Sequence, residues 1–249
     1  HPCETFELLW AAYHLFIGGV PTSLIVPQQE IDTLGQALAS GGVSLSATTF
    51  PIPDADDTAV ALLLLQHLGH PVDPSVLENF ALRDGYFASF PHERHSSVGV
   101  NVHVLHALLR VLGYPNCEHT VDRILDYLND EQVAGLYWLD KWHISPYYAT
   151  AHALCVLEEL PRDQALRVTP MAERSREWLR ETQNADGSWG FCGQPTPEET
   201  AYAVLALAAR DPGDLDQADR RRCALAGRYI RRAMLNTSRW DPEQIYPPL

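Results

Sequence analysis

Basic side chains are scarce in this sequence of 249 residues, and long apolar runs are missing. Eighteen lysine and arginine residues face 32 aspartate and glutamate residues, which gives a formal net charge of −14. A broad positive surface of the kind that binds nucleic acid or an anionic membrane is therefore excluded. The longest unbroken apolar stretches cover residues 59–65 and 201–209, far short of the roughly 20 residues that span a bilayer, so we expect no stable membrane insertion.

Disulfide and zinc patterns are missing as well. The sequence has an odd number of cysteines, none of them in CxxC spacing: Cys3, Cys117, Cys155, Cys192 and Cys223. This argues against a disulfide framework and a zinc ribbon and favours reduced thiols, as in a cytoplasmic protein. Two histidine pairs at i, i+3 spacing, His92/His95 and His103/His106, lack an obvious third ligand. We therefore predict no metal site, and interpret the first pair as part of a polar loop and the second as helix residues.

Lysine is almost absent. Of the eighteen cationic side chains only Lys141 is a lysine, and the others are arginines. Such a bias is typical of a GC-rich genome, and a single lysine can persist by chance. The alternative is functional, because a compact ammonium group is not equivalent to a planar guanidinium group.

Apolar residues recur at helical spacing in several windows, and strict alternation over the length of a strand is missing. Glycine and proline separate these windows, for example at the Pro212-Gly213 joint. We predict helices over residues 5–17, 54–68, 98–112, 120–128, 147–159, 171–182, 198–209 and 219–235. The predicted fold class is all-α.

Four of the predicted helices resemble one another. Thr58, Thr150 and Thr200, with Val102 in the second helix, mark matching positions roughly 45 to 50 residues apart. This spacing is typical of helical hairpins in which buried inner helices alternate with outer ones. About five pairs fit in the chain, one short of a closed six-pair ring. We therefore predict an incomplete double-layered α/α toroid (barrel) over residues 1–249.

Three carboxylates lie at the start of one inner helix, in the segment PIPDADDT. Asp54, Asp56 and Asp57 are each ordinary as helix caps or as first-turn acids that complement the helix dipole. Crowded carboxylates cannot all ionise cheaply, so one of them tends to stay protonated, as a carboxylic general acid requires. Because the helix dipole favours ionisation, such an acid also needs apolar walls and a fixed hydrogen bond.

A second motif lies near the end of a later helix. Arg174, Trp178, Gln183, Gly187 and Trp189 fit the pattern of a basic residue, an aromatic residue, and then Q-x3-G-x-W. Its physics is structural, because an amide and an indole can tie the end of a helix to the neighbouring repeat. This motif indicates an architecture and carries no reaction.

Together these residues resemble the class II terpene cyclases, whose motifs are DxDD and the QW repeat. The match is closer to the bacterial class II diterpene cyclases of the copalyl diphosphate synthase type. It extends over nearly the whole chain, through the segments HPCETFELLW (1–10), DADD (54–57), SVGVNVHVL (97–105), WLDKWH (138–143), the QW segment and EETAY (198–202). The resemblance implies the β-type domain of these enzymes, with residues 1–50 as a candidate junction to a second helical, γ-type domain.

The resemblance also implies roles for individual residues. Asp56, the middle acid, corresponds to the residue that protonates the terminal alkene of an isoprenoid diphosphate, while Asp54 and Asp57 set the orientation and acidity of its proton. Asn101 corresponds to an asparagine that hydrogen-bonds this acid. Lys141 corresponds to the lysine of the DKW segment, which approaches the substrate diphosphate.

A carbocation in a dry pocket is stabilised by the faces of aromatic rings. We select Trp138 and Tyr148 as substrate contacts from the aromatic residues available. The resemblance further implies geranylgeranyl diphosphate as substrate and Mg²⁺ bound with the diphosphate at a site outside this segment. The oligomeric state stays open, with a homodimer as one candidate. The class I motif DDxxD does not occur in the sequence, so the product is expected to keep its diphosphate, as in (ent-)copalyl diphosphate.

Two alternatives stay open. A triterpene cyclase of the squalene-hopene type shares DxDD but usually carries several QW motifs and a membrane-inserting patch, and only one clear QW motif is seen here. A non-catalytic α-toroid binding module would use DADD only as an acidic helix start. Family members also carry segments that this sequence lacks, among them a second helical domain with an acidic Mg²⁺ site and the stretch in which the deprotonating base is often found. The isolated segment is therefore not expected to be sufficient for activity.

Overall fold

The computed structural model describes residues 3–210 and 215–235. The first two residues of the matching segment HPCETFELLW and the predicted joint at Pro212-Gly213 lie outside this part. The described chain is helical, and its elements are α1 (Glu4–Ile17), η1 (Thr22–Leu24), α2 (Gln28–Ala39), α3 (Ala55–His67), η2 (Pro74–Phe80), α4 (Val98–Arg110), α5 (Cys117–Asp130), α6 (Pro146–Leu157), α7 (Arg162–Glu181), α8 (Pro197–Ala208) and α9 (Gln217–Leu235). The predicted all-α class is confirmed.

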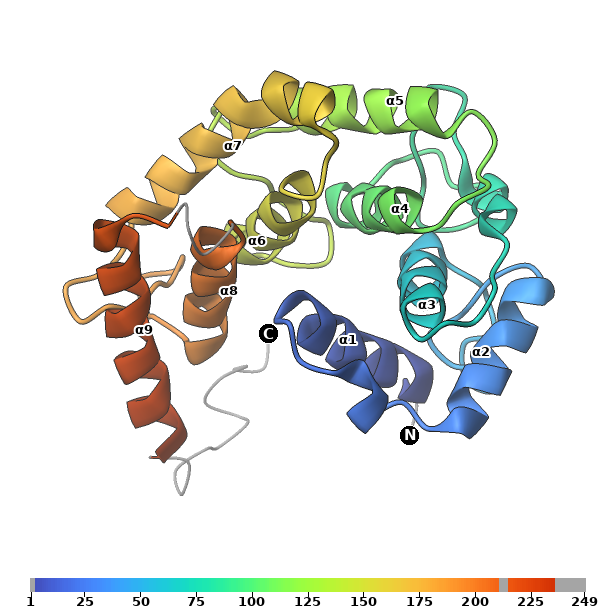
Figure 1. The fold of residues 1–249 in the computed structure, drawn as a ribbon, viewed down its shortest axis with the longest axis horizontal. Helices are drawn as coiled ribbons and strands as arrows, with labels where there is room; N and C mark the ends of the chain where they lie inside the picture. The colour runs from blue at the N-terminus through green and yellow to red at the C-terminus, as the bar shows by residue number, and fades with distance from the viewer. Residues whose placement is uncertain (1–2, 211–214, 236–249) are drawn as a thin grey trace.

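The helices form two layers that curve into an arc (Figure 1). α3, α4, α6 and α8 follow one another along the inner layer, and α2, α5, α7 and α9 cover them from outside. The 3-10 helix η2 contacts both α3 and α4. α1 packs on α3, and a contact of 3.4 Å between the Tyr202 hydroxyl and Nε2 of His14 links it to α8 at the other end of the arc. The double-layered toroid of hairpins is therefore observed.

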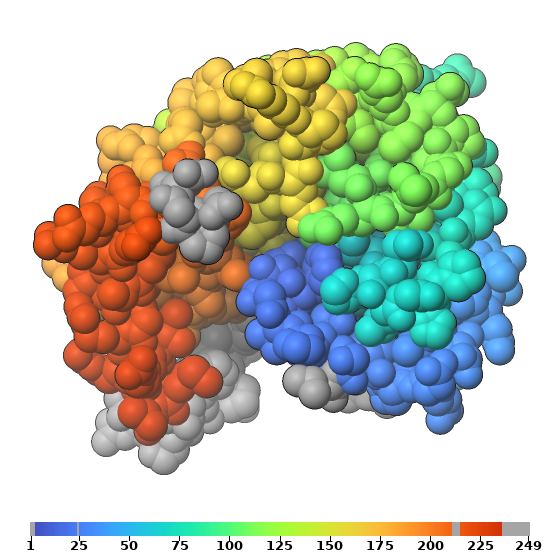
Figure 2. Space-filling view, in the orientation of Figure 1, coloured from blue at the N-terminus to red at the C-terminus, as the bar shows by residue number. Residues whose placement is uncertain are grey.

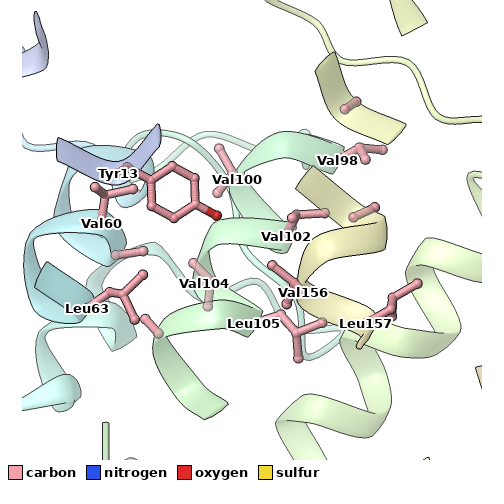
Figure 3. Packing of buried hydrophobic residues seen from close by; sticks show 14 of the residues in the cluster. Tyr13, Val60, Leu63, Val98, Val100, Val102, Val104, Leu105, Val156 and Leu157 are labelled. Atoms are coloured by element: carbon pink, nitrogen blue, oxygen red, sulfur yellow. The ribbon is translucent and has the colours of Figure 1, made fainter. Parts of the chain in front are cut away.

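The inner helices are apolar on nearly every side because both of their faces are covered. In α3 every residue from Ala59 to Leu65 is buried. The valines of α4 interleave with α3 on one side and α6 on the other, and the Tyr13 ring lies beside them (Figure 3). In the space-filling view the arc forms a continuous wall beside α1 (Figure 2). No helix in the described ranges combines the length and the apolar character that a membrane span requires.

Two outer helices differ from the predicted pattern. α2 was not predicted, because only Ile31, Leu34 and Leu38 form its buried stripe and the rest of the helix is polar. α7 begins at Arg162, well before the predicted start at Met171. The predicted helix starts directly after Pro170, yet Pro170 lies inside α7, where it removes one backbone hydrogen bond without ending the helix.

A repeat unit is visible in the hydrogen bonds of two tryptophans about 50 residues apart. The indole of Trp138 donates to the carbonyl of Leu128 (2.7 Å), and the indole of Trp189 donates to the carbonyl of Leu179 (2.8 Å). The backbone N–H of Trp138 donates to Thr150, and that of Trp189 donates to Thr200. Each tryptophan therefore joins the end of an outer helix to the inner helix that follows.

The glutamines before these tryptophans are also equivalent. Gln183 donates to the carbonyl of Arg222 on α9, and Gln132 donates to the carbonyl of Met171 on α7, each 39 residues along the chain. The expectation that an amide ties one repeat to the next is thus confirmed. The sequence analysis found one clear QW motif, but Gln132 and Trp138 form a second unit of the same kind. The number of QW motifs therefore no longer separates a diterpene cyclase from a triterpene cyclase.

Candidate functional site

The three acids lie in the first turn of α3, and each has a different environment. Asp54 is the N-cap, and its Oδ1 accepts a hydrogen bond from the backbone N–H of Asp57 (2.8 Å). Asp54 and Asp57 are buried, whereas the side chain of Asp56 is 19% exposed. Of the three aspartates, only Asp56 has an appreciably exposed side chain.

Burial perturbs the two flanking acids. It raises the pKa of Asp54 to about 7, although the hydrogen bond from the Asp57 backbone opposes the shift. Burial, together with the negative charges of Asp54 and Asp56, raises the pKa of Asp57 well above its usual value. The two flanking carboxyl groups therefore share one cause for their shifts, burial next to other acids, which favours their protonated forms.

The carboxyl group of Asp56 has a histidine as its fixed partner. Nδ1 of His103, on α4, lies 2.6 Å from Oδ1 of Asp56, and the His103 side chain is completely buried. On its other side, Nε2 of His103 lies 3.0 Å from Nδ1 of His152 on α6. The sequence analysis had interpreted His103 only as a helix residue.

Asn101 does not contact Asp56, which corrects the expected hydrogen bond. Its Oδ1 accepts from the backbone N–H of Phe87 (2.9 Å), and its Nδ2 donates to the carbonyls of Phe87 and Ser97. These bonds have the same form as those that Thr150 and Thr200 make with the two tryptophan backbones. Asn101 is therefore a structural residue of the repeat, and it takes the place that the sequence analysis gave to Val102.

When Asn101 is aligned with the three threonines, matching positions of the four inner helices face the inside of the ring. Two positions after Thr58, Asn101, Thr150 and Thr200 lie Val60, His103, His152 and Tyr202. Two positions before them lie Asp56, Gly99, Tyr148 and Glu198. Residues four apart lie on one face of a helix, so each inner helix contributes one pair to the same surface. This register is the sequence signal that could have identified His103 and His152.

Aromatic side chains of α1 cover this surface. Trp10 stacks parallel to His152, with ring centroids 6.2 Å apart, and meets His103 edge-on at 4.7 Å. The hydroxyl of Tyr13 bonds to Nδ1 of His106 at 3.0 Å. Burial lowers the pKa of His14, His106 and His152, the last of them well below its usual value.

Tyr148 belongs to the same cluster, and its contact with a substrate stays a prediction. Its ring lies edge-on to His152 at 4.3 Å and stacks on His143 at 3.6 Å. Burial raises the pKa of Tyr148 well above its usual value. The stacking on His143 connects the cluster to the WLDKWH segment.

Within that segment, Asp140 anchors the loop that carries Lys141. Its Oδ1 accepts from the Ser97 hydroxyl (2.6 Å) and from the backbone N–H of Gly99 (3.1 Å), at the start of α4. A Cβ atom at Gly99 would lie 2.9 Å from this oxygen, so the close approach requires glycine. Burial alone would raise the pKa of Asp140, but hydrogen bonds from His143, Ser97 and the backbone hold it well below its usual value.

Lys141 follows this anchor and points to an acid in another loop. Its Nζ lies 2.8 Å from Oε1 of Glu93, and its side chain is 28% exposed. Oε2 of Glu93 accepts from the backbone N–H groups of Ser89 and Phe90. The same ammonium group lies 5.1 Å from the ring centre of Trp142. Lys141 is thus a partly exposed cation whose partner is a single carboxylate.

Trp138 does not lie in this cluster, which corrects its expected role as a substrate contact. Its side chain is completely buried between α5 and α6, and its indole N–H is used by the carbonyl of Leu128. The sequence pattern of an aromatic residue before DKW could not separate a pocket wall from a repeat anchor.

No group of three or more His, Cys, Asp or Glu side chains in the described ranges is arranged to hold a metal ion. The histidines at the centre of the ring are bonded to Asp56, Tyr13 and one another rather than converging on one point. The residues present therefore do not fit a resident Mg²⁺ ion.

Comparison with known proteins gives a consistent result. The family model of the squalene-hopene cyclase C-terminal domain matches residues 93–246. The chain is 35% identical over 249 residues to an ent-copalyl diphosphate synthase from Streptomyces sp. (strain KO-3988), covering 98% of this chain and 47% of that protein. It is 42% identical over 216 residues to a labda-7,13-dienyl diphosphate synthase from Streptomyces clavuligerus, covering 84% of this chain and 38% of that protein.

A solved structure agrees with these relatives. The ent-copalyl diphosphate synthase from Streptomyces platensis superimposes with a TM-score of 0.81 at 33% identity, over 92% of this chain and 44% of that one. The chain thus spans about half of the length of the relatives that it matches.

Proposed function

Since the chain belongs to the class II diterpene cyclases, within the family of the squalene-hopene cyclase C-terminal domain, we propose that it starts a cyclisation by protonating an alkene. The proposed substrate is geranylgeranyl diphosphate, and the proposed acid is Asp56. Proton transfer to the distal double bond creates a carbocation, two rings close, and loss of a proton elsewhere gives a bicyclic diphosphate. This chain provides the residues proposed for the first step, the protonation of the alkene.

The environment of Asp56 carries this proposal. One oxygen of its carboxyl group is held by His103, and the side chain retains 19% exposure. The other oxygen is therefore available to a substrate at the ring surface. The nearby acids Asp54 and Asp57 have raised pKa values because they are buried. Such surroundings favour a carboxylic acid that acts as a proton donor.

The aromatic cluster is suited to the cation that follows. The faces and edges of Trp10 and Tyr148 surround the histidine pair beside Asp56. Ring faces stabilise a nearby positive charge, and the effect is larger when water is absent. Nδ1 of His152 is bonded to His103 and its Nε2 is buried. Burial also lowers the pKa of this ring well below its usual value, so it is a poor base for removing a proton from the cation.

Lys141 is the proposed contact for the diphosphate. It is partly exposed, and its present partner Glu93 is one carboxylate, which a diphosphate group with several charges can outcompete. Because DDxxD does not occur, the diphosphate is proposed to remain in the product. The names of the relatives differ in the diphosphate that is formed, so we propose ent-copalyl diphosphate only as the first candidate to test. No step of the proposal passes through Mg²⁺.

The test is an assay of the full-length protein with geranylgeranyl diphosphate and Mg²⁺, with the dephosphorylated product identified by mass spectrometry. A bicyclic product is expected, and Asp56→Asn is expected to lower turnover at least about a hundredfold. Asp73→Asn is the matched control, because Asp73 is also a helix-capping aspartate but is exposed and distant in sequence from the cluster. Turnover of squalene instead would favour a triterpene cyclase. Lack of product together with an unchanged melting temperature on adding substrate would favour a binding module.

A further inference from the structure

Asp56 is the first member of a chain of three side chains from three inner helices. Nδ1 of His103 lies 2.6 Å from Oδ1 of Asp56, and Nε2 of His103 lies 3.0 Å from Nδ1 of His152. The chain ends there, because Nε2 of His152 is buried and has no hydrogen-bond partner in the part of the chain that the structure describes. One end of the chain is therefore the proposed acid, and the other end is an isolated nitrogen.

The lack of a partner for Nε2 of His152 determines which nitrogen of this ring carries the proton. A neutral imidazole carries one N–H donor and one bare acceptor nitrogen. If His152 carried its proton on Nε2, a buried N–H would have no acceptor, and orphaned buried donors are rarer than orphaned acceptors. If the proton is on Nδ1 instead, it is used in the bond to His103, and only a lone pair is left without a partner. Burial favours the second arrangement because a buried N–H without an acceptor loses its hydrogen bond to water and gains none in return.

The proton on Nδ1 of His152 then fixes the state of the next ring. Nε2 of His103 must accept this hydrogen bond, so a neutral His103 carries its own proton on Nδ1. That N–H points at Oδ1 of Asp56. Oδ1 is thereby occupied as an acceptor, and the acid proton of Asp56 is left to Oδ2.

We propose that His152 is a positioning residue that holds His103 in the Nδ1–H tautomer, so that the carboxyl proton of Asp56 sits on the oxygen turned away from His103. This inference rests on the proposed function. When Oδ2 gives its proton to the alkene, the O–H bond breaks, a C–H bond forms, and the carboxylate keeps the hydrogen bond from His103. No proton moves along the two histidines in this step, and water replaces the lost proton after the product leaves.

The packing around His152 supports a fixed ring orientation. Trp10 stacks on it with an angle of 1° between the ring planes, and Tyr148 and Tyr13 meet it edge-on at 4.3 and 5.4 Å. Rotation of the imidazole by half a turn would have to displace these rings. The histidine therefore presents the same nitrogen to His103 throughout.

The groups that face this pair from each neighbouring element are known. Burial is the main cause that lowers the pKa of His152, and the nearby histidines act in the same direction. The titratable neighbours are Tyr13 and His14 of α1, Asp56 of α3, His106 of α4, His143 of the WLDKWH loop, Tyr148 of α6 and Tyr202 of α8. Asp56 is the carboxylate bonded to the pair, and Glu159 lies 3.3 Å from Nε2 of His106.

The first experiment measures the tautomer directly, by ¹⁵N NMR of the full-length protein with labelled histidine. His103→Gln assigns the His103 signals. In the unmodified protein we expect Nδ1 of His103 to give a protonated, pyrrole-type signal and Nε2 to give a bare, pyridine-type signal. We expect His152→Asn to retain this pattern, because an amide N–H can occupy the place of Nδ1. In His152→Leu the pattern is expected to be lost.

His106→Asn is the matched control. His106 is a buried histidine one turn along α4, and it bonds to Tyr13 and approaches Glu159 rather than Asp56. Its substitution is expected to leave the His103 tautomer unchanged. A bare Nδ1 or a doubly protonated ring at His103 in the unmodified protein would overturn the proposal, as would a His152→Leu variant with an unchanged His103 pattern.

The second experiment follows turnover against pH. Once His152 no longer donates, the proton of His103 can move to Nε2, and Asp56 then donates to Nδ1 and becomes a weaker acid. We expect His152→Leu to lower kcat at least about tenfold and to move the alkaline limb of the kcat profile to higher pH. His152→Asn should keep that limb in place. If the unmodified protein lacks cyclase activity, the proposed function fails. If it is active and His152→Leu matches it in kcat and pH profile, this inference alone fails.

Discussion

His103 holds the carboxyl group of Asp56 across 47 residues of sequence, through a contact of 2.6 Å between Nδ1 and Oδ1. The two residues lie on adjacent inner helices, α3 and α4, which pack closely along the ring. The side chain of His103 is completely buried, so its ring has one orientation relative to the acid. This contact occupies Oδ1 of Asp56, so in the proposed function Oδ2 is the oxygen that faces the substrate.

The first prediction concerns this contact. We expect His103→Leu to lower kcat at least about tenfold while KM changes little, because the acid loses its orientation but the diphosphate contact is unaffected. His103→Gln retains an N–H donor and is expected to recover part of the lost rate. Steady-state kinetics with geranylgeranyl diphosphate would check both variants, with circular dichroism to confirm the fold. A loss confined to KM would show that His103 acts on substrate binding instead.

The second prediction concerns stability against pH. Burial raises the pKa of Asp54 to about 7 and also raises that of Asp57, whereas both are ordinary in the unfolded chain. The folded state therefore binds more protons between about pH 4 and 7, and the free energy of unfolding falls as pH rises through this window. Asp54→Asn keeps the N-cap hydrogen bond but does not ionise. We expect the free energy of unfolding of this variant to be about 2–4 kcal/mol higher than that of the unmodified protein at pH 8. Near pH 4 the two values should be equal.

Urea denaturation at several pH values would measure this difference. Asp73→Asn is the control, because the hydrogen bond from the backbone of Ser75 lowers the pKa of Asp73. Its contribution is present at neutral pH and is lost only as pH falls through the acid range. Parallel pH curves for Asp54→Asn and the unmodified protein would mean that the buried acids do not hold protons.

The third prediction concerns Lys141. We expect Lys141→Gln to raise KM for geranylgeranyl diphosphate about tenfold or more, because a charge-assisted contact contributes about 1.5–3 kcal/mol. Lys141→Arg keeps the charge but not the compact ammonium group, and its KM should lie between the two. Inhibition by inorganic pyrophosphate should weaken in parallel. Arg110→Gln is the control, since Arg110 is paired with Glu159 at the C-terminal end of α4, whereas the Lys141 loop is anchored at its start. An unchanged KM in Lys141→Gln would remove Lys141 from the diphosphate site.

Local physics made most of the fold predictable. The inner helices α3, α6 and α8 have sharp starts, because Asp54, Ser145 and Thr196 are N-caps and glycine or proline separates the segments. The outer helices were harder to predict. A stripe of three apolar residues in α2 is weak evidence, and Pro170 in α7 has the local signature of a helix start although packing carries the helix through it.

The site was predictable in its acids but not in their partners. Three carboxylates at a helix start stand out in the sequence, whereas a buried histidine is indistinguishable from a core residue until its neighbours are known. The contacts of His103 join residues 47 and 49 positions apart, and they depend on the register between neighbouring helices. Aligning Val102 instead of Asn101 with the threonines shifted that register by one residue, which concealed the shared position of His103 and His152.

The last prediction concerns Trp138 and Tyr148, which the sequence alone suggested as substrate contacts. Trp138 and Trp189 make equivalent bonds to Leu128 and Leu179, so Trp138→Phe and Trp189→Phe should lower the free energy of unfolding by a similar amount, about 1–3 kcal/mol, through the lost hydrogen bond and buried volume. Neither should change KM by more than about twofold. Tyr148→Leu should instead lower kcat at least about tenfold, because the ring that faces the cluster beside Asp56 is lost. Chemical denaturation together with kinetics measures both effects, and a raised KM in Trp138→Phe alone would return Trp138 to the substrate pocket.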